Sequence, residues 1–279
     1  MKKLNRVLSL SAAAALALSL TACSGGTSGT ADTPAADNTS ASTGGSGDTY
    51  TVAVIKQMDH ASLDEIADAI AARLDEIAAE NGITIQYEVT SGQGDQTVLR
   101  QLADQAIADG VDAIIPIATT AAQVAAVSAE ESQTPVVFAA ISYPETADLT
   151  GIDYVTGTSD ALDTNLILDM MLAQNPELQS VGLLYSLSEP NSEVPIADAK
   201  AYLDEKGIAY TEATANTNDE VIAAASSLIA DGVDAVFTPT DNIIMAAELA
   251  IYEDFINAGI PHYTGADSFV RNGAFATCG

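Results

Sequence analysis

Apolar residues recur along the chain with two different spacings, and the two spacings take turns. Residues 50–55 form a short, mostly apolar run that predicts a strand, whereas residues 62–79 repeat apolar positions at the spacing of a helix. Asn81 and Gly82 would end that helix, because glycine readily takes the left-handed conformation of a C-cap. The same succession continues to residue 159. It predicts strands at 83–89, 113–118, 135–141 and 155–159 and helices at 98–108 and 121–130.

One stretch of sequence occurs twice with a single conservative change. Residues 107–114 read IADGVDAI, and residues 229–236 read IADGVDAV. In both copies an apolar helix ends at a turn with Asp-Gly, and a short apolar strand follows. This repetition indicates an internal duplication, so we predict two Rossmann-like α/β lobes with parallel sheets joined by a hinge. The carboxyl ends of their strands would border one ligand-binding crevice.

The second copy lies inside a further series of alternating elements. Lobe one is expected to span residues 50–160 and lobe two residues 161–266, with residues 267–279 starting a return to lobe one through a last strand at 273–277. Because nothing follows that strand, lobe one is expected to be incomplete and the fold to be C-terminally truncated. Within lobe two the pattern predicts helices at 162–173, 192–206, 218–230 and 243–258 and strands at 181–185, 208–213, 235–239 and 261–265.

The N-terminus has the features of an export signal. Basic residues precede an apolar run at residues 8–20, which predicts a signal peptide over residues 1–22 that is too short to span a bilayer. The sequence LTAC ends at Cys23, resembles a bacterial lipobox and predicts a lipid-modified cysteine. Residues 23–49 are mainly small and polar, which is typical of a flexible tether. The protein is therefore expected at the cell membrane, lipid-anchored on the extracytoplasmic side.

Composition narrows the range of partners. The chain has 279 residues, of which 48% are hydrophobic and 17% charged, so two globular domains are expected. The formal net charge of -30 disfavours nucleic acid and anionic membrane surfaces as partners, because both require basic patches. The two cysteines, Cys23 and Cys278, exclude a disulfide framework.

The sequence gives no positive sign of a metal site, a cofactor or a catalytic centre. The two histidines, His60 and His262, lie far apart, and the cysteines do not pair at ligand spacing. The segment GQG at 92–94 lacks the third glycine of a dinucleotide fingerprint, and neither a P-loop lysine nor a Gly-x-Ser-x-Gly elbow occurs. We therefore expect a binding protein without a cofactor.

Small polar residues follow the predicted strand ends, where the start of a helix offers free N–H groups to an anion. Thr119 and Thr120 follow a strand of lobe one and could hold a ligand carboxylate, with a plain helix cap as the alternative role. Asn191 and Ser192 follow the first apolar strand of lobe two. They are expected to hold the polar end of the ligand from the other side.

A ligand amine would need a carboxylate partner. Thr240, Asp241 and Asn242 follow the second copy of the repeat, and Asp267 follows the last predicted strand of lobe two. Asp267 is the first candidate for the amine contact and Asp241 the second. The alternative for Asp267 is a hinge or cap carboxylate, and the alternative for Asp241 is a helix cap.

Three more residues are candidates for the ligand site because of their place after predicted strands or in a loop. His60 could touch the ligand or stack on its ring, and Tyr143 could add an aromatic contact or belong to a surface loop. Gln96 is a weaker candidate that could instead brace its loop. His262, beside Pro261 at a strand start, is expected to be structural.

Several stretches, in this order and spacing, resemble the substrate-binding lipoproteins of ABC transporters of the tryptophan/tyrosine type. They are DHASLD at 59–64, GDQ at 94–96, IATTAAQ at 117–123, TSD at 158–160, SEPNS at 188–192, PTDN at 239–242, DS at 267–268 and GAFAT at 273–277. The resemblance implies the type I periplasmic-binding-protein fold, whose lobes close on a ligand by hinge motion. It also implies an aromatic amino acid as ligand, an ABC permease and its ATPase as partners, and a monomer. Such proteins usually continue for roughly 50 residues past this end.

Two other classes of function remain open at this point. The protein could be a sensory ligand-binding lipoprotein or a receptor for a sugar or a nucleoside, which would use the same lobes and crevice. It could also be an extracytoplasmic α/β enzyme. A repressor on this fold is disfavoured because a signal and a tether stand where a DNA-binding head would be and because the charge is strongly acidic.

Overall fold

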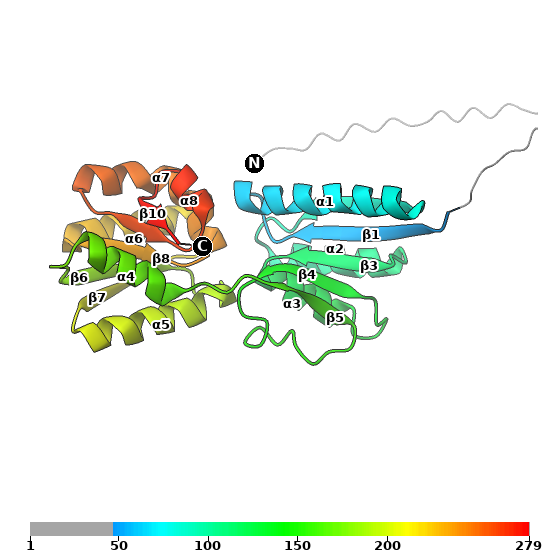
Figure 1. Cartoon of the computed structure of the whole chain (residues 1–279), viewed down its shortest axis with the longest axis horizontal. Coiled ribbons are helices and arrows are strands. Elements are labelled where there is room, and N and C mark those ends of the chain that lie inside the picture. The colour runs from blue at the N-terminus through cyan, green and yellow to red at the C-terminus, as the bar shows by residue number, and fades with distance from the viewer. Residues whose placement is uncertain (1–46, 279) are drawn as a thin grey trace, which may run out of the picture. The chain divides into compact units, whose positions relative to one another are not determined.

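The structure is a computed structural model that describes residues 47–278 (Figure 1). The expected signal peptide at 1–22, the lipid modification of Cys23 and most of the tether at 23–49 lie outside the described residues. None of the helices within 47–278 combines the length and the apolar character that crossing a bilayer requires.

Lobe one is built on a five-stranded sheet in the order β2-β1-β3-β4-β5, in which every neighbouring pair is parallel. β1 is an interior strand, and its Val54 pairs with Val89 of β2 and Ile115 of β3. The helices lie between consecutive strands, as the alternating pattern predicted. The elements are β1 (Thr49–Lys56), α1 (Ala61–Asn81), β2 (Thr84–Ser91), α2 (Gln96–Ala108), β3 (Ala113–Ile117), α3 (Thr119–Ser128), β4 (Val136–Ile141) and β5 (Val155–Ser159).

Lobe two carries a second five-stranded parallel sheet, in the order β10-β9-β8-β6-β7. β6 is an interior strand here, and its Gly182 pairs with Thr211 of β7 and Val236 of β8. The elements are α4 (Thr164–Gln174), β6 (Ser180–Tyr185), α5 (Pro190–Lys206), β7 (Ala209–Thr214), α6 (Asn218–Asp231), β8 (Ala235–Thr238), α7 (Asn242–Ala258), β9 (His262–Thr264), α8 (Asp267–Arg271) and β10 (Ala276–Thr277).

The two sheets have the same topology. Counted in chain order within each lobe, both run 2-1-3-4-5. The two copies of the repeated sequence lie at equivalent places, where α2 leads into β3 and where α6 leads into β8. The structure therefore confirms the prediction of two similar α/β lobes. In sheets of this order the crevice for a ligand opens outside the carboxyl ends of the strands, where the strand order reverses.

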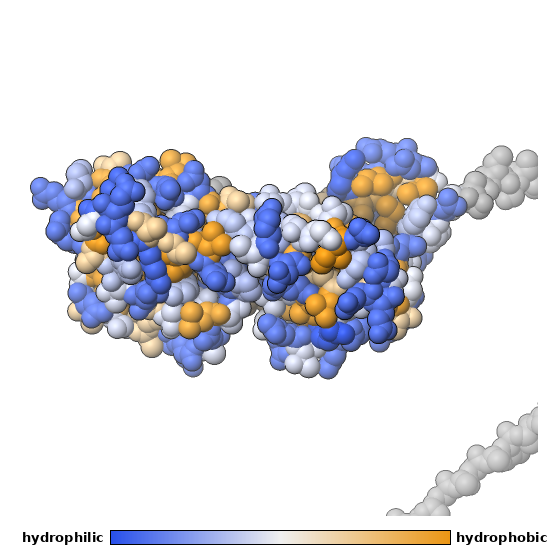
Figure 2. Space-filling view, turned by 90° about the horizontal axis from the view of Figure 1, so that it is seen from below, coloured by the Kyte–Doolittle hydropathy of each residue, from blue (hydrophilic) through white to orange (hydrophobic). Residues whose placement is uncertain are grey.

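Helices cover both faces of each sheet (Figure 1). In lobe one, Leu63 of α1 packs with Val54 in one apolar cluster, and Leu99 of α2 packs with Ile114 in another. In lobe two, α4 and α5 share one cluster with the sheet, and α6 and α7 share the other. In the space-filling view of one face, hydrophilic residues dominate the surface, and hydrophobic residues occur in separate groups between them (Figure 2).

The last segment of the protein differs from the prediction. Residues 267–279 were expected to return to lobe one, but α8 and β10 both belong to lobe two. Phe269 of α8 is 1% exposed and packs in the cluster of α6 and α7. β10 extends the sheet at its edge, with Ala276 paired to Tyr263 and Thr277 to Thr264 of β9. These apolar and backbone contacts make β10 the fifth strand of the sheet of lobe two. The sequence pattern had assigned this strand to lobe one.

The start of α3 also differs from the prediction, which placed it at residue 121. The helix begins at Thr119, directly after Ala118, whose φ of 77° turns the chain sharply at the end of β3. Only glycine adopts this conformation without steric cost. The turn places Thr119 and Thr120 inside the first turn of the helix rather than in a loop before it.

Candidate ligand-binding site

A cavity of about 330 Å³ lies between the two lobes. Five helices begin beside it, and the residues at their starts line it: His60 before α1, Thr119 of α3, Asn191 of α5, Asn242 of α7 and Asp267 of α8. Four of these helices follow the first or third strand of a lobe, which are the strands flanking the point where the strand order reverses. The cavity thus occupies the place that the topology predicts for a ligand.

One wall of the cavity is apolar. Leu63, Ile66 and Ala69 of α1 lie along one face of that helix, three residues apart, and all line the cavity. Met245 of α7 and Phe269 of α8 line it from lobe two. An apolar side chain of a ligand would be removed from water between these two groups.

Two residues that line the lobe-one side have strained backbones. Ala118, at the end of β3, and Ala140, in β4, have φ values of 77° and 57°. Each such position costs on the order of 1–3 kcal/mol in a residue other than glycine, and such positions concentrate at ligand sites. Their presence supports the cavity as the functional site.

Another part of the lining forms a polar edge whose hydrogen-bonding groups are not all paired. The side-chain amide of Asn191 donates to the carbonyl of Thr240, and the hydroxyls of Ser142 and Thr240 lie 3.3 Å apart. Among the described residues, Asn191 Oδ1 and His60 Nδ1 are buried and have no hydrogen-bond partner. Because buried polar atoms are rarely left unpaired, these two atoms are suited to polar groups of a ligand.

A buried hydrogen-bond network joins the lobes behind this polar edge. Gln57 Nε2 donates to Glu189 Oε1 at 2.5 Å, and Asn242 Nδ2 donates to Glu189 Oε2 at 2.6 Å. Asn242 Oδ1 lies 3.0 Å from His60 Nε2. Burial, with a smaller contribution from the carboxylate of Asp241, raises the pKa of Glu189 to about 8. Burial also lowers the pKa of His60, so its ring is neutral at pH 7.

Asp241 lines the cavity but is already fully engaged. Its side chain accepts from Ile243 N and Ile244 N at 3.0 Å and caps α7. It also accepts from Ser186 N and Ser192 Oγ at 2.7 Å. Burial raises the pKa of Asp241, and these four donors oppose that effect by stabilising the carboxylate. Asp241 therefore joins β6, α5 and α7 and has little capacity left for a ligand.

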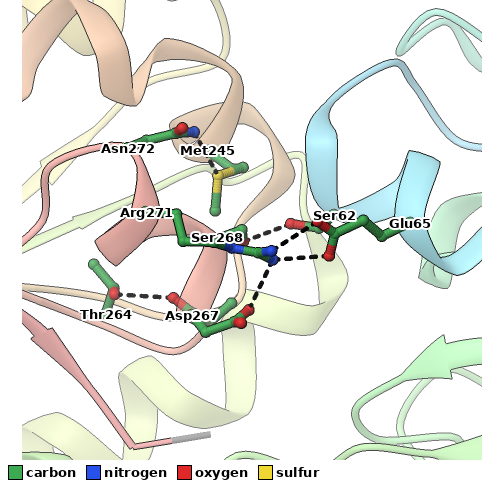
Figure 3. Close-up of polar contacts among 9 residues, drawn as sticks. Ser62, Glu65, Met245, Thr264, Asp267, Ser268, Arg271 and Asn272 are labelled. Carbon is green, nitrogen blue, oxygen red and sulfur yellow. Dashed lines mark hydrogen bonds and ion pairs between the residues drawn. The ribbon is translucent and has the colours of Figure 1, made fainter.

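A charged group closes the edge formed by α1 and α8 (Figure 3). The guanidinium of Arg271 is bidentate on Glu65, with Nη1–Oε1 and Nη2–Oε2 distances of 2.7 and 2.8 Å. Arg271 Nη2 also lies 3.4 Å from Asp267 Oδ1, and the hydroxyl of Ser62 donates to that of Ser268 beside the ion pair. Arg271 is the only lysine or arginine among the residues that line the cavity.

Most of the residues that the sequence singled out come together here, and four lie elsewhere. Tyr143 donates to the carbonyl of Leu162, and Ser192 lies behind the cavity on Asp241. Gln96 and Thr120 border a separate surface depression, and the backbone N–H of Thr120 donates to Gln57 Oε1. The predicted residues that line the cavity are His60, Thr119, Asn191, Thr240, Asp241, Asn242 and Asp267.

The cavity also contains residues that were not predicted. Ser142 and Asp160 follow β4 and β5, so the rule that identified Thr119 could have found them. Ser62 and Glu65 lie within α1, where a polar residue facing a ligand has the same spacing as one facing solvent. Ser268 and Arg271 were missed because their segment was assigned to the other lobe.

His262 is buried in lobe two, as expected for a structural histidine. Its Nε2 lies 2.8 Å from Thr238 Oγ1 and its Nδ1 lies 3.2 Å from Glu248 Oε1. It does not line the cavity.

Comparison with known proteins places the sequence among proteins that bind small molecules. The family described as ABC transporter substrate binding protein matches residues 51–279. A tyrosine-binding protein of Clostridioides difficile (strain R20291) is 27% identical over 233 residues, which cover 82% of this chain and 67% of the relative. The structure of an ABC domain in complex with L-Trp from Streptococcus pneumoniae is 26% identical, with a TM-score of 0.76 over 82% of this chain and 78% of that one.

A more distant structure supports the fold alone. A branched-chain amino acid transporter substrate binding protein of Streptococcus pneumoniae, in complex with isoleucine, is 17% identical and gives a TM-score of 0.60. The match covers 81% of this chain and 67% of that one. The arrangement of two parallel α/β lobes is therefore shared well beyond the range of close sequence similarity.

Proposed function

This chain belongs to the family of ABC transporter substrate-binding proteins, and from that premise we propose that it captures an aromatic amino acid in the cavity between its lobes. Members of the family bind substrates for a transporter and are not enzymes. One observation carries the proposal: the lining of the cavity is divided between apolar side chains and buried, unpaired polar atoms at helix starts. An aromatic amino acid has the same division between an apolar ring and a charged backbone.

The size and lining of the cavity support this ligand. Its volume of about 330 Å³ is at the lower end of the range for small-molecule sites, roughly 300–1,000 Å³. We assign the ring to the wall formed by Leu63, Ile66 and Phe269. The related proteins that bind tyrosine or L-Trp support an aromatic side chain, and the identities of 27% and 26% leave the choice among aromatic amino acids to experiment.

The charges around the cavity favour a ligand with an ammonium group. Four carboxylates line the cavity against one arginine: Glu65, Asp160, Asp241 and Asp267. Glu65 is held by Arg271, and Asp241 is held by its four donors, so neither is free to receive the ammonium. We assign the ammonium to Asp267, because its side chain is 71% exposed and its only side-chain contact among the described residues is the 3.4 Å contact with Arg271. Asp160 is the alternative carboxylate.

The carboxylate of the ligand has a matching place at the helix starts. Asn191 and Thr119 lie in the first turns of α5 and α3, where backbone N–H groups and the helix dipole favour an anion. We propose that the closed lobes then present the ligand to an ABC permease that works with its ATPase. We also propose that the protein acts on the extracytoplasmic side as a monomer, held at the membrane by a lipid on Cys23.

Direct titration with L-tryptophan tests the proposed ligand. The protein has no tryptophan, so indole fluorescence in the mixture comes from the ligand alone. We expect saturable binding of L-tryptophan, L-tyrosine or L-phenylalanine by fluorescence or calorimetry, and a matching rise in melting temperature. Tryptamine, which keeps the ammonium, should bind better than indole-3-propionate, which keeps only the carboxylate. Binding of a sugar or a nucleoside and of no amino acid would keep the two-lobed receptor and overturn the proposed ligand.

A substitution tests the amine contact. Asp267→Ala should weaken binding about tenfold or more, because a hydrogen bond to a charged group is lost. Asp153→Ala is the matched control, since Asp153 is exposed and does not line the cavity. If Asp160→Ala weakens binding and Asp267→Ala does not, the ammonium belongs at Asp160.

A further inference from the structure

Arg271 lies between two carboxylates that belong to different lobes (Figure 3). Glu65 is on α1 of lobe one, and its two oxygens match the fork of the guanidinium at 2.7 and 2.8 Å. Asp267 is on α8 itself, four residues before Arg271, and is the longer contact at 3.4 Å. The same cation therefore has one partner across the cavity and one on its own helix.

The two contacts respond differently to a separation of the lobes. The contact with Asp267 lies within one helix and survives any movement of lobe two as a body. The contact with Glu65 exists only when α1 and α8 are close together. Among the described residues, Arg271–Glu65 is the ion pair that joins the lobes, because the other ion pairs each lie within one lobe.

We propose that Arg271 is a switch that couples capture of the ligand ammonium to closure of the lobes. In the empty, open protein Arg271 pairs with Asp267. The ammonium of the ligand takes over Asp267, and Arg271 turns fully to Glu65 and holds α1 against α8. This inference rests on the proposed function, since it names the consequence of the ammonium contact at the same site.

The geometry suits this exchange of partners. Arg271, Glu65 and Asp267 keep 49%, 58% and 71% of their side-chain surfaces exposed, so the side chains are free to rotate and the ion pair carries no large desolvation cost. The hydroxyls of Ser62 and Ser268 meet beside the pair, so a neutral contact closes at the same edge. A bidentate pair fixes the geometry of the closed edge, and a pair this exposed contributes little enough free energy to open again.

The first experiment measures ligand exchange with L-tryptophan by stopped-flow fluorescence. Glu65→Gln removes the closed-state partner, so we expect dissociation to become roughly two- to fivefold faster while association is nearly unchanged. Added salt should speed dissociation from the unaltered protein and have less effect on this variant. Glu76→Gln is the matched control, because Glu76 pairs with Arg73 within α1 and does not touch lobe two.

The second experiment needs no ligand and measures the radius of gyration by small-angle X-ray scattering. Asp267→Asn removes the open-state partner of Arg271, so the empty protein should become more compact. Adding Glu65→Gln to that variant should reverse the change, because Arg271 then has neither partner. Asparagine keeps the shape of the exposed Asp267 side chain, so folding should be retained.

The outcomes separate this inference from the proposed function. If L-tryptophan and the other aromatic amino acids fail to bind, the proposed ligand is wrong, and the scattering measurement still tests whether Arg271 exchanges between Asp267 and Glu65. If L-tryptophan binds, and Glu65→Gln changes neither its dissociation nor the salt response, the switch is wrong. An empty Asp267→Asn variant with an unchanged radius of gyration would equally overturn it.

Discussion

Two buried carboxylates differ in their surroundings: Asp241, which lines the cavity, and Glu189, which lies behind it. Asp241 accepts hydrogen bonds from three backbone N–H groups and one hydroxyl. Glu189 accepts only from the neutral amides of Gln57 and Asn242, with the charge of Asp241 nearby. Both carboxyl groups are deeply buried, but hydrogen bonds stabilise the charged form of Asp241 more than that of Glu189. Glu189 is therefore the group whose protonation should change with pH near neutrality.

The stability of the protein should fall as the pH rises towards 8. Above the ordinary pKa of 4.5 the unfolded chain releases the proton of Glu189, while the folded protein keeps it up to about pH 8. The stabilisation is complete below pH 4.5 and is lost progressively as the pH rises to the folded pKa. Urea unfolding at a series of pH values from about 7 to 8 should show this negative slope.

That range of pH separates Glu189 from His60. The pKa of His60 is lowered in the fold from 6.5, so its contribution to stability is present above 6.5 and is lost only at lower pH. Glu189→Gln should flatten the slope, because the variant has no carboxyl group to titrate at this position. The fold should tolerate the change, because the amide of Asn242 can rotate to accept from the new side chain. Glu193→Gln, at an exposed position in the first turn of α5, which Glu189 precedes, should leave the slope unchanged. A slope that survives in Glu189→Gln would assign it to another group.

For single residues, the sequence predicted which of them lie at the cavity better than it predicted the hydrogen bonds that they make. Thr119, Asn191 and Asn242 were found because they follow apolar strands, and the order of elements alone brings such residues to one crevice. The pairing of Gln57 with Glu189 joins residues 132 positions apart in different lobes, and no local pattern indicates it. Asp241 lines the cavity, but the sequence could not show that four donors already occupy its carboxylate.

The short helix α8 shows how an element can depend on one side chain. It has five residues, too few for a helix to be stable by itself. Phe269 anchors it by packing at 1% exposure in the cluster of α6 and α7, with its ring centroid 6.1 Å from that of His262. The same helix carries Asp267, Ser268 and Arg271 to the cavity, so the anchor also holds part of the site.

Phe269→Ala should lower the free energy of unfolding by about 3–5 kcal/mol, the usual cost of truncating a buried aromatic residue. Phe275→Ala is the matched control in the same lobe, because Phe275 is 52% exposed, and its loss should cost much less. Chemical denaturation of both variants measures the difference. Equal costs would mean that Phe269 does not anchor α8.

The elements themselves were largely readable from the pattern of apolar residues. The repeat predicted the equivalence of β3 and β8, and the alternation of strands and helices predicted two parallel sheets. The assignment of α8 and β10 to lobe one was wrong, because a strand of two residues carries almost no pattern of its own. Its lobe is decided by the pairing of Ala276 with Tyr263, a tertiary contact.

The molecule as a whole carries a large excess of negative charge. Its 9 lysine and arginine residues face 39 acidic residues, and the formal net charge is -30. Repulsion among these charges favours the expanded, unfolded state over the compact fold. The same excess gives the cavity an acidic setting, which agrees with a ligand that carries an ammonium group.

Salt should therefore stabilise the fold even though it weakens the ion pair of Arg271. Raising NaCl from about 0.01 M to about 0.5 M shortens the screening length from about 30 Å to a few ångströms, which removes long-range repulsion over the whole surface. We expect the melting temperature of the ligand-free protein to rise over this range. A single exposed ion pair contributes at most about 1 kcal/mol, so its loss should not reverse the effect.

A charge-reduced variant tests whether screening is the cause. Exposed acidic residues without side-chain partners can be replaced by their amides, which keeps shape and removes charge. This variant should melt higher than the unaltered protein at low salt and gain less from added NaCl. If both proteins gain equally, the salt acts through solvation of the protein rather than through its charge. The substitutions are Asp68→Asn, Glu131→Gln, Asp204→Asn and Asp254→Asn.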